Sequence, residues 1–199
     1  MIKISNLDQT PPYKKFKFFY DEAIKNNQSS IEAMTIASYS TKHNEVDSRF
    51  VNLKYIQKDK WIFFSNYDSK KAEQFNSHNQ VSALLYWNKI DVQIRIKGKV
   101  EKTQEDISDN HYSDRKIFKN ALAHSSQQSQ KVNSFKLIED KYNEVLKKEN
   151  LLKKRPENWG GYSITPYYIE FWKGQESRLN HREVFELKNY EWVSFILQP

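Results

Sequence analysis

The stretch RFVNLKYIQ, residues Arg49–Gln57, decides the fold of this chain. Every second residue from Val51 to Tyr55 is apolar and its neighbours are more polar, the period of two that predicts a β-strand with one buried face. We expect a single strand over this range, with two cations, Arg49 and Lys54, five residues apart. A regular strand would place these two side chains on opposite faces, so a bulge, a twist or two different ligands must separate their roles.

The segments around this strand predict a sheet with helices inserted between its strands. Further strands are predicted at 31–39, 61–65, 81–87, 92–100, 159–164, 168–172, 183–187 and 192–196. Helices are predicted at 16–26, 69–78 and 132–148, and one more opens at Thr103 with a capping-box pattern. The alternation of strand and helix that parallel sheets require is absent. The pattern therefore predicts a mainly β fold with inserted helices, an antiparallel barrel.

Length and composition limit the remaining classes. With 199 residues, 38% of them hydrophobic, the chain fits one compact domain. We expect an N-terminal helical extension over 1–28 and a single β-barrel domain over 29–199. The absence of cysteine excludes disulfides and cysteine-based zinc sites. Histidine spacing indicates no metal site, and the lack of a signal peptide or long apolar stretch leads us to expect a cytoplasmic protein.

The net charge of +7 raises the question of an anionic partner. The lysines are scattered along the chain and form no single basic block. This distribution favours a phosphorylated small molecule over nucleic acid, and a lysine-rich solvated surface explains the charge equally well.

Five segments, in order, resemble the pyridoxamine 5'-phosphate oxidase family. They are SRFVNLK (Ser48–Lys54), FFSNYDSKKAEQ (Phe63–Gln74), VQIRIKGKVE (Val92–Glu101), WGGYSITPYYIEFW (Trp159–Trp172) and ESRLNHR (Glu176–Arg182). The resemblance extends from about residue 31 to residue 199. It implies an FMN-binding split β-barrel of Greek-key type that forms a homodimer with the flavin at the subunit interface.

The resemblance also implies a set of cofactor-binding residues. These are Arg49, Lys54, Phe64, Ser65, Lys70, Lys71, Gln93, Gln128, Ser129, Trp172 and Arg182. An arginine fork suits a phosphate because it donates two hydrogen bonds at fixed geometry. Lys70 and Lys71 lie at the start of a predicted helix, where free backbone N–H groups favour an anion.

On the substrate side, the resemblance implies Lys54, His111, Arg115, Lys119, Arg178 and Asn180, with Arg178 as the catalytic residue that positions the substrate. Three of these positions depart from the family pattern. The family's phosphate-binding tyrosine falls on His111, its serine on Lys119, and its histidine on Asn180. A slip of one residue would restore Tyr112 or His181. His111 and Lys119 can both carry positive charge, so phosphate binding survives the first two changes.

Three functions follow as hypotheses. The first is oxidation of pyridoxamine or pyridoxine 5'-phosphate to pyridoxal 5'-phosphate with FMN and oxygen, which yields hydrogen peroxide. The second is a related FMN oxidase of another substrate, similar to the phenazine-biosynthesis members of the family, and the three departures motivate it. The third is a non-catalytic protein that binds flavin or phosphate.

Overall fold

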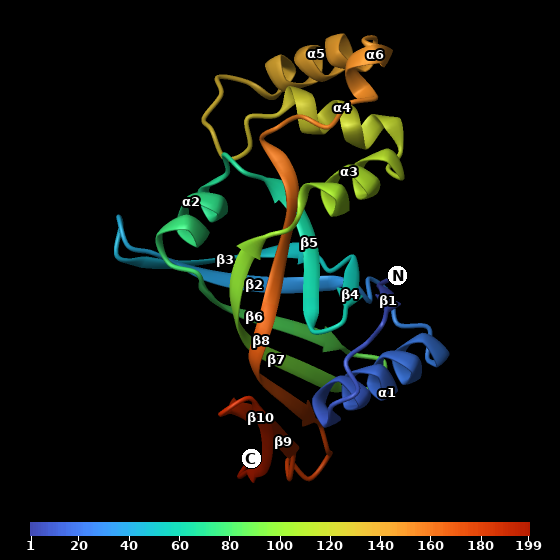
Figure 1. Ribbon diagram of the computed structural model, residues 1–199, viewed down its shortest axis with the longest axis vertical. Helices are drawn as coiled ribbons and strands as arrows, with labels where there is room; N and C mark the ends of the chain where they lie inside the picture. Colours follow the sequence, from blue (N-terminus) through green and yellow to red (C-terminus); the bar gives the residue numbers. More distant parts are fainter.

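The computed structural model describes residues 1–199 as one ten-stranded sheet with six helices (Figure 1). The strands are β1 (Lys3–Ser5), β2 (Ala33–Ser40), β3 (Glu45–Asn52), β4 (Tyr55–Gln57), β5 (Lys60–Asn66), β6 (Gln80–Trp87), β7 (Val92–Lys102), β8 (Trp159–Lys173), β9 (His181–Lys188) and β10 (Glu191–Leu197). The helices are α1 (Pro11–Lys25), α2 (Lys70–Ser77), α3 (Glu105–Ser113), α4 (Ile117–Ser125), α5 (Phe135–Leu146) and α6 (Glu149–Leu152).

The sheet is antiparallel except where β1 pairs in parallel with β4. Its main path is β1-β4-β5-β8-β7-β6-β2-β3, and β9 joins β8 and carries β10. The long strand β8 pairs with β7 from Tyr162 to Lys173 and changes its other partner part-way. Trp159–Ile164 pair with β5, whereas Tyr168–Lys173 pair with β9. This change of partner splits the barrel, and it places the two ends of β8 in different parts of the molecule.

The main core lies between the inner face of the sheet and α1. Ile94 on β7 and Phe171 on β8 are buried there, as the period-two pattern of these strands predicts. From α1, Phe16 and Tyr20 pack into the same cluster, with the Phe16 ring 4.6 Å from that of Trp61. The predicted division after residue 28 stays a prediction, although α1 shares the core of the barrel.

The predicted single strand over 49–57 is wrong, because the chain changes partners inside it. β3 pairs with β2, but at Leu53 the chain crosses the sheet and β4 pairs with β5. Leu53 is fully buried at this crossing, and the backbone N–H of Lys54 donates to the carbonyl of Ile62 at 2.8 Å. Arg49 and Lys54 therefore belong to different strands, which answers the question raised by their spacing.

Other boundaries also differ from prediction. The two strands predicted at 159–164 and 168–172 are one strand, and β1, α4 and α6 were not predicted. The capping box at Thr103 is absent: α3 begins after Gln104, and the Thr103 hydroxyl bonds that of Ser108 instead. The closing hairpin at Asn189–Tyr190 is confirmed, with both turn residues in the left-handed region.

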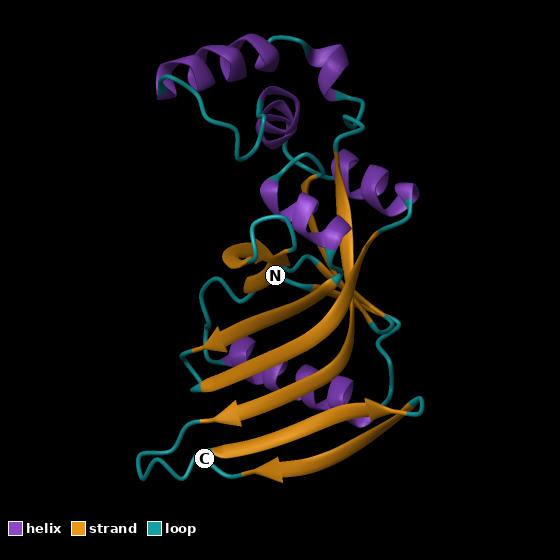
Figure 2. Ribbon diagram, turned by 90° about the vertical axis from the view of Figure 1, so that its left-hand side faces the viewer, coloured by secondary structure: helices purple, strands orange, loops and turns teal.

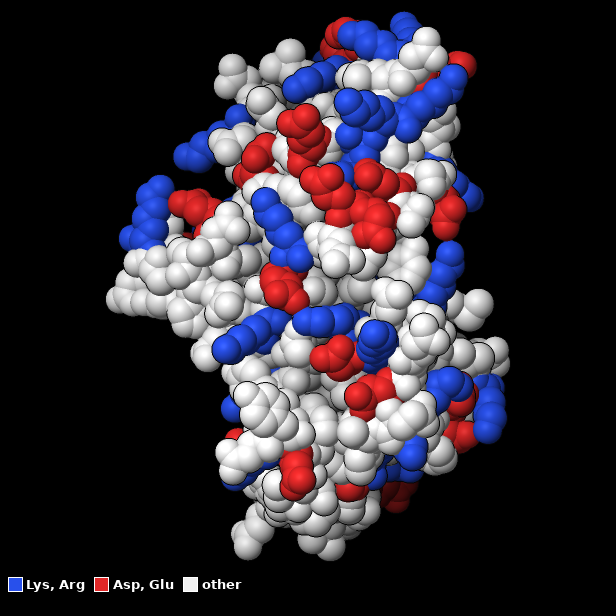
Figure 3. Space-filling model, viewed as in Figure 1, with Lys and Arg blue, Asp and Glu red and all other residues white.

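Four of the six helices, α3 to α6, gather at one end of the molecule (Figure 2). α3 to α6 lie above the end of the sheet at which β8 begins, and α1 lies across the barrel strands (Figures 1 and 2). Basic and acidic side chains are interspersed on the face drawn in Figure 3. None of the six helices combines the length and apolarity needed to cross a membrane.

Candidate functional site

A small cavity at the start of α2 gathers predicted cofactor ligands from three segments. It measures about 290 Å³, and its lining is Asp47, Arg49, Phe50, Lys70, Lys71, Gln128 and Ser129. Five of these seven residues are predicted FMN ligands, although they come from β3, α2 and the loop before α5. The structure thus brings together residues that lie up to 80 positions apart in the sequence, since Arg49 and Ser129 line the same cavity.

Arg49 is fixed in this cavity by its own strand and its neighbours. Its guanidinium donates to the hydroxyl of Ser38 at 2.6 Å and to the amide oxygen of Gln74 at 2.9 Å, and it pairs with Asp47 at 2.8 Å. Together with a longer contact of 3.5 Å to the Ile36 carbonyl, these contacts use four of the five N–H donors of the guanidinium. They orient the side chain and leave one donor for a ligand. Asp47 offsets part of its charge.

Lys71 is a buried cation without an acidic partner. Its ammonium donates to the hydroxyls of Ser65 and Ser69 at 3.2 and 3.3 Å and to the amide oxygen of Gln128 at 3.2 Å. Burial, together with the nearby charge of Arg49, lowers the pKa of Lys71 from 10.5 to about 8. An uncompensated buried cation at a helix N-terminus fits a phosphate group.

Lys70, next to it, is a different kind of residue. It is exposed and pairs with Glu45 at 2.9 Å. It also lines the same cavity, and an ammonium that pairs with one carboxylate keeps further N–H donors for a ligand.

A second cavity, of about 540 Å³, gathers predicted substrate ligands. Its lining includes four of them, Lys54, His111, Arg115 and Lys119. The charged side chains around it are Lys3, Lys54, Arg115, Lys116 and Lys119, against Asp114 alone. The cavity therefore favours an anionic ligand.

Arg115 has a donor directed at no protein atom. Its Nη1 is buried and has no hydrogen-bond partner, while Nη2 donates to the carbonyl of Lys119 at 3.1 Å. The guanidinium lies 4.2 Å from the ring centre of Trp159, and burial lowers the pKa of Arg115. A buried donor without a partner on this half-buried cation is costly in the free protein, and a ligand oxygen would satisfy it.

His111 corrects one expectation. Its ring stacks on that of Phe64 with 3.7 Å between centres, and Tyr55 bonds its Nδ1 at 2.8 Å. Burial, followed by the charges of Arg115, Lys54 and Lys3, lowers the pKa of His111 to about 4. At neutral pH His111 is therefore uncharged, and only Lys119 of the two departing residues adds positive charge.

A third, smaller cavity lies between the first two. It measures about 150 Å³, and it shares Phe64, Arg115 and Trp159 with the substrate-side cavity and Gln128 with the cavity at Lys71. Ser65, another predicted cofactor ligand, lines it and is buried. The three cavities thus adjoin through shared walls.

Five predicted residues lie elsewhere. Gln93, Trp172 and Arg182 form one row across β7, β8 and β9. Arg178 and Asn180 lie in the loop after β8, where Arg178 is exposed and the Asn180 side chain accepts a bond from the backbone of Gln175.

The distance along β8 separates this row from the cavities. Trp159 lines two cavities at the start of β8, and Trp172 lies at its other end. An extended strand of this length spans about 40 Å at roughly 3.3 Å per residue. Even a cavity of about 1,000 Å³, roughly 12 Å across, could not contain both ends. One chain alone does not bring all the predicted residues together.

Arg182 is held in its row by a buried acid. Glu170 is fully buried on β8, and it accepts from Arg182 and Arg95 at 2.8 Å each and from the Tyr168 hydroxyl at 2.8 Å. Burial and Glu170 raise the pKa of Tyr168 to about 12. The acid fixes the orientation of Arg182.

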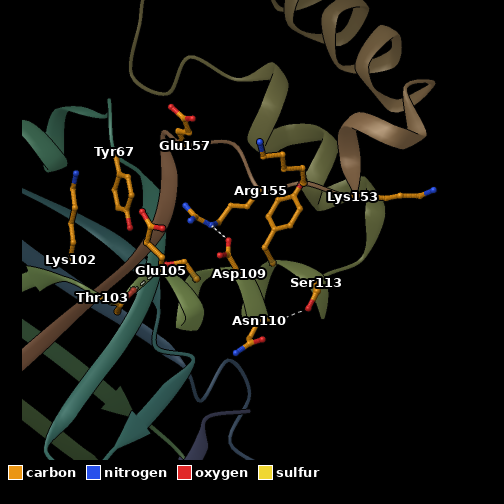
Figure 4. A pocket seen from close by; sticks show the side chains of 13 residues that line it. Tyr67, Lys102, Thr103, Glu105, Asp109, Asn110, Ser113, Lys153, Arg155 and Glu157 are labelled. Atoms are coloured by element: carbon orange, nitrogen blue, oxygen red, sulfur yellow. Dashed lines mark hydrogen bonds and ion pairs between the residues drawn. The ribbon is translucent and has the colours of Figure 1, made fainter.

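A larger cavity, of about 890 Å³, contains no predicted site residue (Figure 4). Its side chains come mainly from α3 and from the segment that precedes β8. Arg155 pairs with Asp109 across it at 2.6 Å, and Lys102 lies over the Tyr67 ring at 4.2 Å. Because three acidic side chains face four basic ones, this cavity does not resemble the anion-binding cavities described above.

Sequence reasoning missed several residues of the site. Tyr55 and Trp159 line the substrate-side cavity, and Ser38 and Gln74 hold Arg49. Tyr55 offered no signal, because the change of strand that places it in the cavity looks like one continuous strand in the sequence. Ser38 offered no signal, because its role depends on the pairing of β2 with β3.

Comparison with known families shows to which protein family the chain belongs. The pyridoxamine 5'-phosphate oxidase model matches residues 20–149, and the model of the pyridoxine 5'-phosphate oxidase C-terminal dimerisation region matches residues 159–199. The chain belongs to the pyridoxamine 5'-phosphate oxidase family. This family consists of FMN-dependent oxidoreductases, which favours the enzyme hypotheses over a non-catalytic binding protein. The match to the dimerisation region supports a homodimer.

Curated members of the family are similar over nearly the whole chain. The pyridoxine/pyridoxamine 5'-phosphate oxidase of Legionella pneumophila (strain Lens) is 33% identical over 192 residues, which covers 96% of this chain and 89% of that protein. The enzyme of the same name from Leptospira interrogans serogroup Icterohaemorrhagiae serovar copenhageni (strain Fiocruz L1-130) is 32% identical, with 94% and 88% covered.

Solved structures confirm the fold of the family. PhzG from Burkholderia lata 383, in complex with tetrahydrophenazine-1-carboxylic acid, has a TM-score of 0.89 and 25% identity, with 96% of this chain and 95% of that chain covered. A pyridoxamine 5'-phosphate oxidase-related, FMN binding protein from Nostoc punctiforme PCC 73102 has a TM-score of 0.75 at 11% identity, covers 96% of this chain and 100% of its own, and supports the fold alone. The expected split β-barrel is therefore confirmed.

Proposed function

We propose that this chain oxidises pyridoxamine or pyridoxine 5'-phosphate to pyridoxal 5'-phosphate, with FMN as cofactor and oxygen as the electron acceptor. The observation that carries the proposal is the substrate-side cavity, in which five basic side chains face one acid and the buried Nη1 of Arg115 has no partner. A phosphorylated substrate supplies the oxygens that this donor lacks.

The two cavities divide the anions between them. Arg49 and Lys71 would hold the phosphate of FMN, because Lys71 donates hydrogen bonds only to neutral groups and forms no ion pair of its own. Lys54, Arg115 and Lys119 would hold the phosphate of the substrate. When bound, FMN supplies the hydride acceptor for the carbon that bears the amine or alcohol group. The chain contributes orientation and charge.

The remaining residues would come from the second subunit of a homodimer. The partner subunit's Gln93, Trp172 and Arg182 would complete the flavin site, and the partner subunit's Arg178 and Asn180 would face the substrate. The separation of about 40 Å along one strand supports this arrangement. The match of residues 159–199 to a dimerisation region supports it as well.

Turnover by the purified protein tests the proposal. FMN and pyridoxamine 5'-phosphate are added in air, and pyridoxal 5'-phosphate and hydrogen peroxide are measured together. We expect equal amounts of the two products, and a flavin absorption spectrum that remains with the protein after desalting. A protein that holds FMN but forms neither product would overturn the substrate assignment and leave the cofactor assignment standing.

A second candidate is an FMN oxidase of a dihydro-aromatic acid. Two observations favour it: the similarity to PhzG, which was solved with tetrahydrophenazine-1-carboxylic acid, and the presence of Asn180 where the family has a histidine. Oxygen consumption with reduced phenazine carboxylates tests it. Consumption that exceeds the rate with pyridoxamine 5'-phosphate would replace the first candidate with this one.

A further inference from the structure

Tyr55 and His111 form a bonded pair in the wall of the substrate-side cavity. The Tyr55 hydroxyl lies 2.8 Å from Nδ1 of His111, and both residues line the cavity that also contains Arg115. They come from separate elements, because Tyr55 begins β4 and His111 lies on α3. The fold therefore assembles this pair at the place where we propose that the substrate binds.

Aromatic stacking fixes the His111 ring. The ring lies parallel to Phe64, at 11° and 3.7 Å between centres, and to Trp159, at 13° and 6.2 Å. Tyr55 meets the same ring edge-on, at 85°. The histidine edge thus has a set direction, and its hydrogen bond with Tyr55 lies along that edge.

The pair is neutral at physiological pH. The charged groups that face His111 are Arg115, Lys54 and Lys3, with Asp114 opposing them, and together with burial they hold its pKa at about 4. Burial also raises the pKa of Tyr55. The imidazole and the phenol therefore keep the same protonation between about pH 6 and pH 9.

A count of hydrogens shows which ligand atom suits this pair. A neutral imidazole and a phenol each have one donor hydrogen, and their mutual bond uses only one of the two. If Tyr55 donates to Nδ1, the Nε2–H of His111 is free; in the other tautomer, the Tyr55 O–H is free. In either case one donor hydrogen remains for an acceptor, and a phosphate oxygen is an acceptor in a cavity that already attracts anions.

We propose that Tyr55 is a further substrate-binding residue, whose hydroxyl and its partner His111 together give one uncharged hydrogen bond to the substrate's phosphate group. This inference rests on the proposed function for the identity of the substrate. The pair distinguishes phosphorylated from unphosphorylated substrates, and it does so without a charge that pH could remove.

The variant Tyr55→Phe tests the inference because it removes the hydroxyl and keeps the ring. We expect the KM for pyridoxamine 5'-phosphate to rise about tenfold, which corresponds to about 1.4 kcal/mol. We expect kcat to change less than twofold, and kcat/KM for unphosphorylated pyridoxamine to stay at the wild-type value. A general structural defect would lower kcat/KM for both substrates together.

Two further variants act as controls. Tyr142→Phe removes a hydroxyl that bonds the Phe118 carbonyl at 3.2 Å, outside the three adjoining cavities, and it should leave the KM unchanged. His111→Phe keeps the stack on Phe64, and the double variant Tyr55→Phe/His111→Phe should raise the KM no more than the larger of the two single effects. If the effects of the two single variants on the KM add up independently in the double variant, the inference that Tyr55 and His111 act as one unit is overturned.

The wild-type protein separates this inference from the proposed function. If wild type turns over and Tyr55→Phe has the same KM, the inference fails and the function stands. If wild type does not turn over, the binding of inorganic phosphate to the FMN-loaded protein is measured by calorimetry. Binding that Tyr55→Phe weakens about tenfold supports Tyr55 as an anion ligand of another substrate. Equal binding, or none to wild type, overturns the inference.

Discussion

Lys71 donates hydrogen bonds only to neutral groups and lies near the positive charge of Arg49, with Asp47 as the one opposing charge. This is an unfavourable setting for a buried ammonium. Its pKa of about 8 expresses this cost. Between about pH 8 and its ordinary value of 10.5, the unfolded chain holds more protons at this residue than the folded one. The contribution of Lys71 to the stability of the FMN-free protein therefore increases with pH across that window.

The proposed phosphate of FMN reverses this preference, because it binds the charged form of Lys71. We expect the FMN affinity of wild type to fall as pH rises above about 8. Lys71→Met should weaken FMN binding at least tenfold at pH 7 and make the affinity depend less on pH. Quenching of flavin fluorescence measures both. Lys42 is an exposed lysine that pairs with Glu73 on α2, and Lys42→Met should change neither the FMN affinity nor its pH dependence. If the FMN affinity of Lys71→Met depends on pH as strongly as that of wild type, the prediction is contradicted.

Glu170 is the other residue whose charge matters, because it holds the side chains of Arg95 and Arg182 in place. It is fully buried, and its two arginine partners are only partly exposed. Glu170→Gln leaves Arg95 and Arg182 without their acid, and we expect a loss of about 2 kcal/mol in the free energy of unfolding, less than for a fully buried pair. Urea denaturation at a fixed protein concentration measures this. Glu101→Gln, from an exposed pair with Lys60, should cost less than about 0.5 kcal/mol, and an equal loss in both variants would refute the role of burial.

Among the elements, β8 holds the sheet together, and its contact with β7 has no spare room. The register between the two strands shifts at Lys97/Gly98. A Cβ added at Gly98 would lie 2.5 Å from a methyl group of Ile164 and 2.7 Å from the carbonyl oxygen of Thr165. The close approach of the two backbones therefore explains why residue 98 is a glycine. A special backbone conformation is not the reason, because no glycine has a positive φ.

We expect Gly98→Ala to destabilise the protein by about 2 kcal/mol, since the backbone of β8 must move to admit a methyl group. Urea denaturation without FMN measures the change. The neighbouring exposed residue provides the comparison, and Lys99→Ala should fall within about 0.5 kcal/mol of wild type. A neutral Gly98→Ala would mean that β8 is not rigid at this point.

The elements that could be predicted from the sequence are those whose pattern is local. Val92–Lys102 alternates buried and exposed residues, and the period of two is enough to identify it. The break at Leu53 could not be predicted, because an apolar residue at a strand crossing looks like any inward-facing residue of one strand. α6, with four residues, is too short for a periodic signal.

For the candidate site, the resemblance to the family identified binding residues that the spacing of residues in the sequence could not identify alone. Gln128 and Ser129 look like an ordinary polar loop in the sequence, yet they line the same cavity as Arg49. The uncharged state of His111 could not be predicted either, since it depends on burial between Phe64 and Trp159. Tertiary packing decides both properties.

For the whole molecule, the proposed site is complete only in the dimer, and mixed dimers test this. Arg49→Met removes one half of the flavin site and Arg182→Met the other. In a mixed dimer of the two variants, one site carries both defects and the other carries none. Since random pairing makes half of the dimers mixed, a fully exchanged mixture should recover about a quarter of wild-type activity.

Each variant alone should remain inactive in the same assay, and the mixture must be prepared by co-expression or by refolding the chains together. If both residues served one chain's own site, every site would keep one defect. The mixture would then be as inactive as its components, which is the outcome that would contradict a shared site.

The partner change along β8 has a consequence for assembly. Because one strand carries cavity residues at its start and the row with Trp172 at its end, each bound flavin would join two polypeptides. Cofactor supply would then control the quaternary state: dilution should separate the FMN-free protein into monomers sooner than the loaded protein. A shortage of flavin would thus release single chains, rather than leave an intact but idle enzyme.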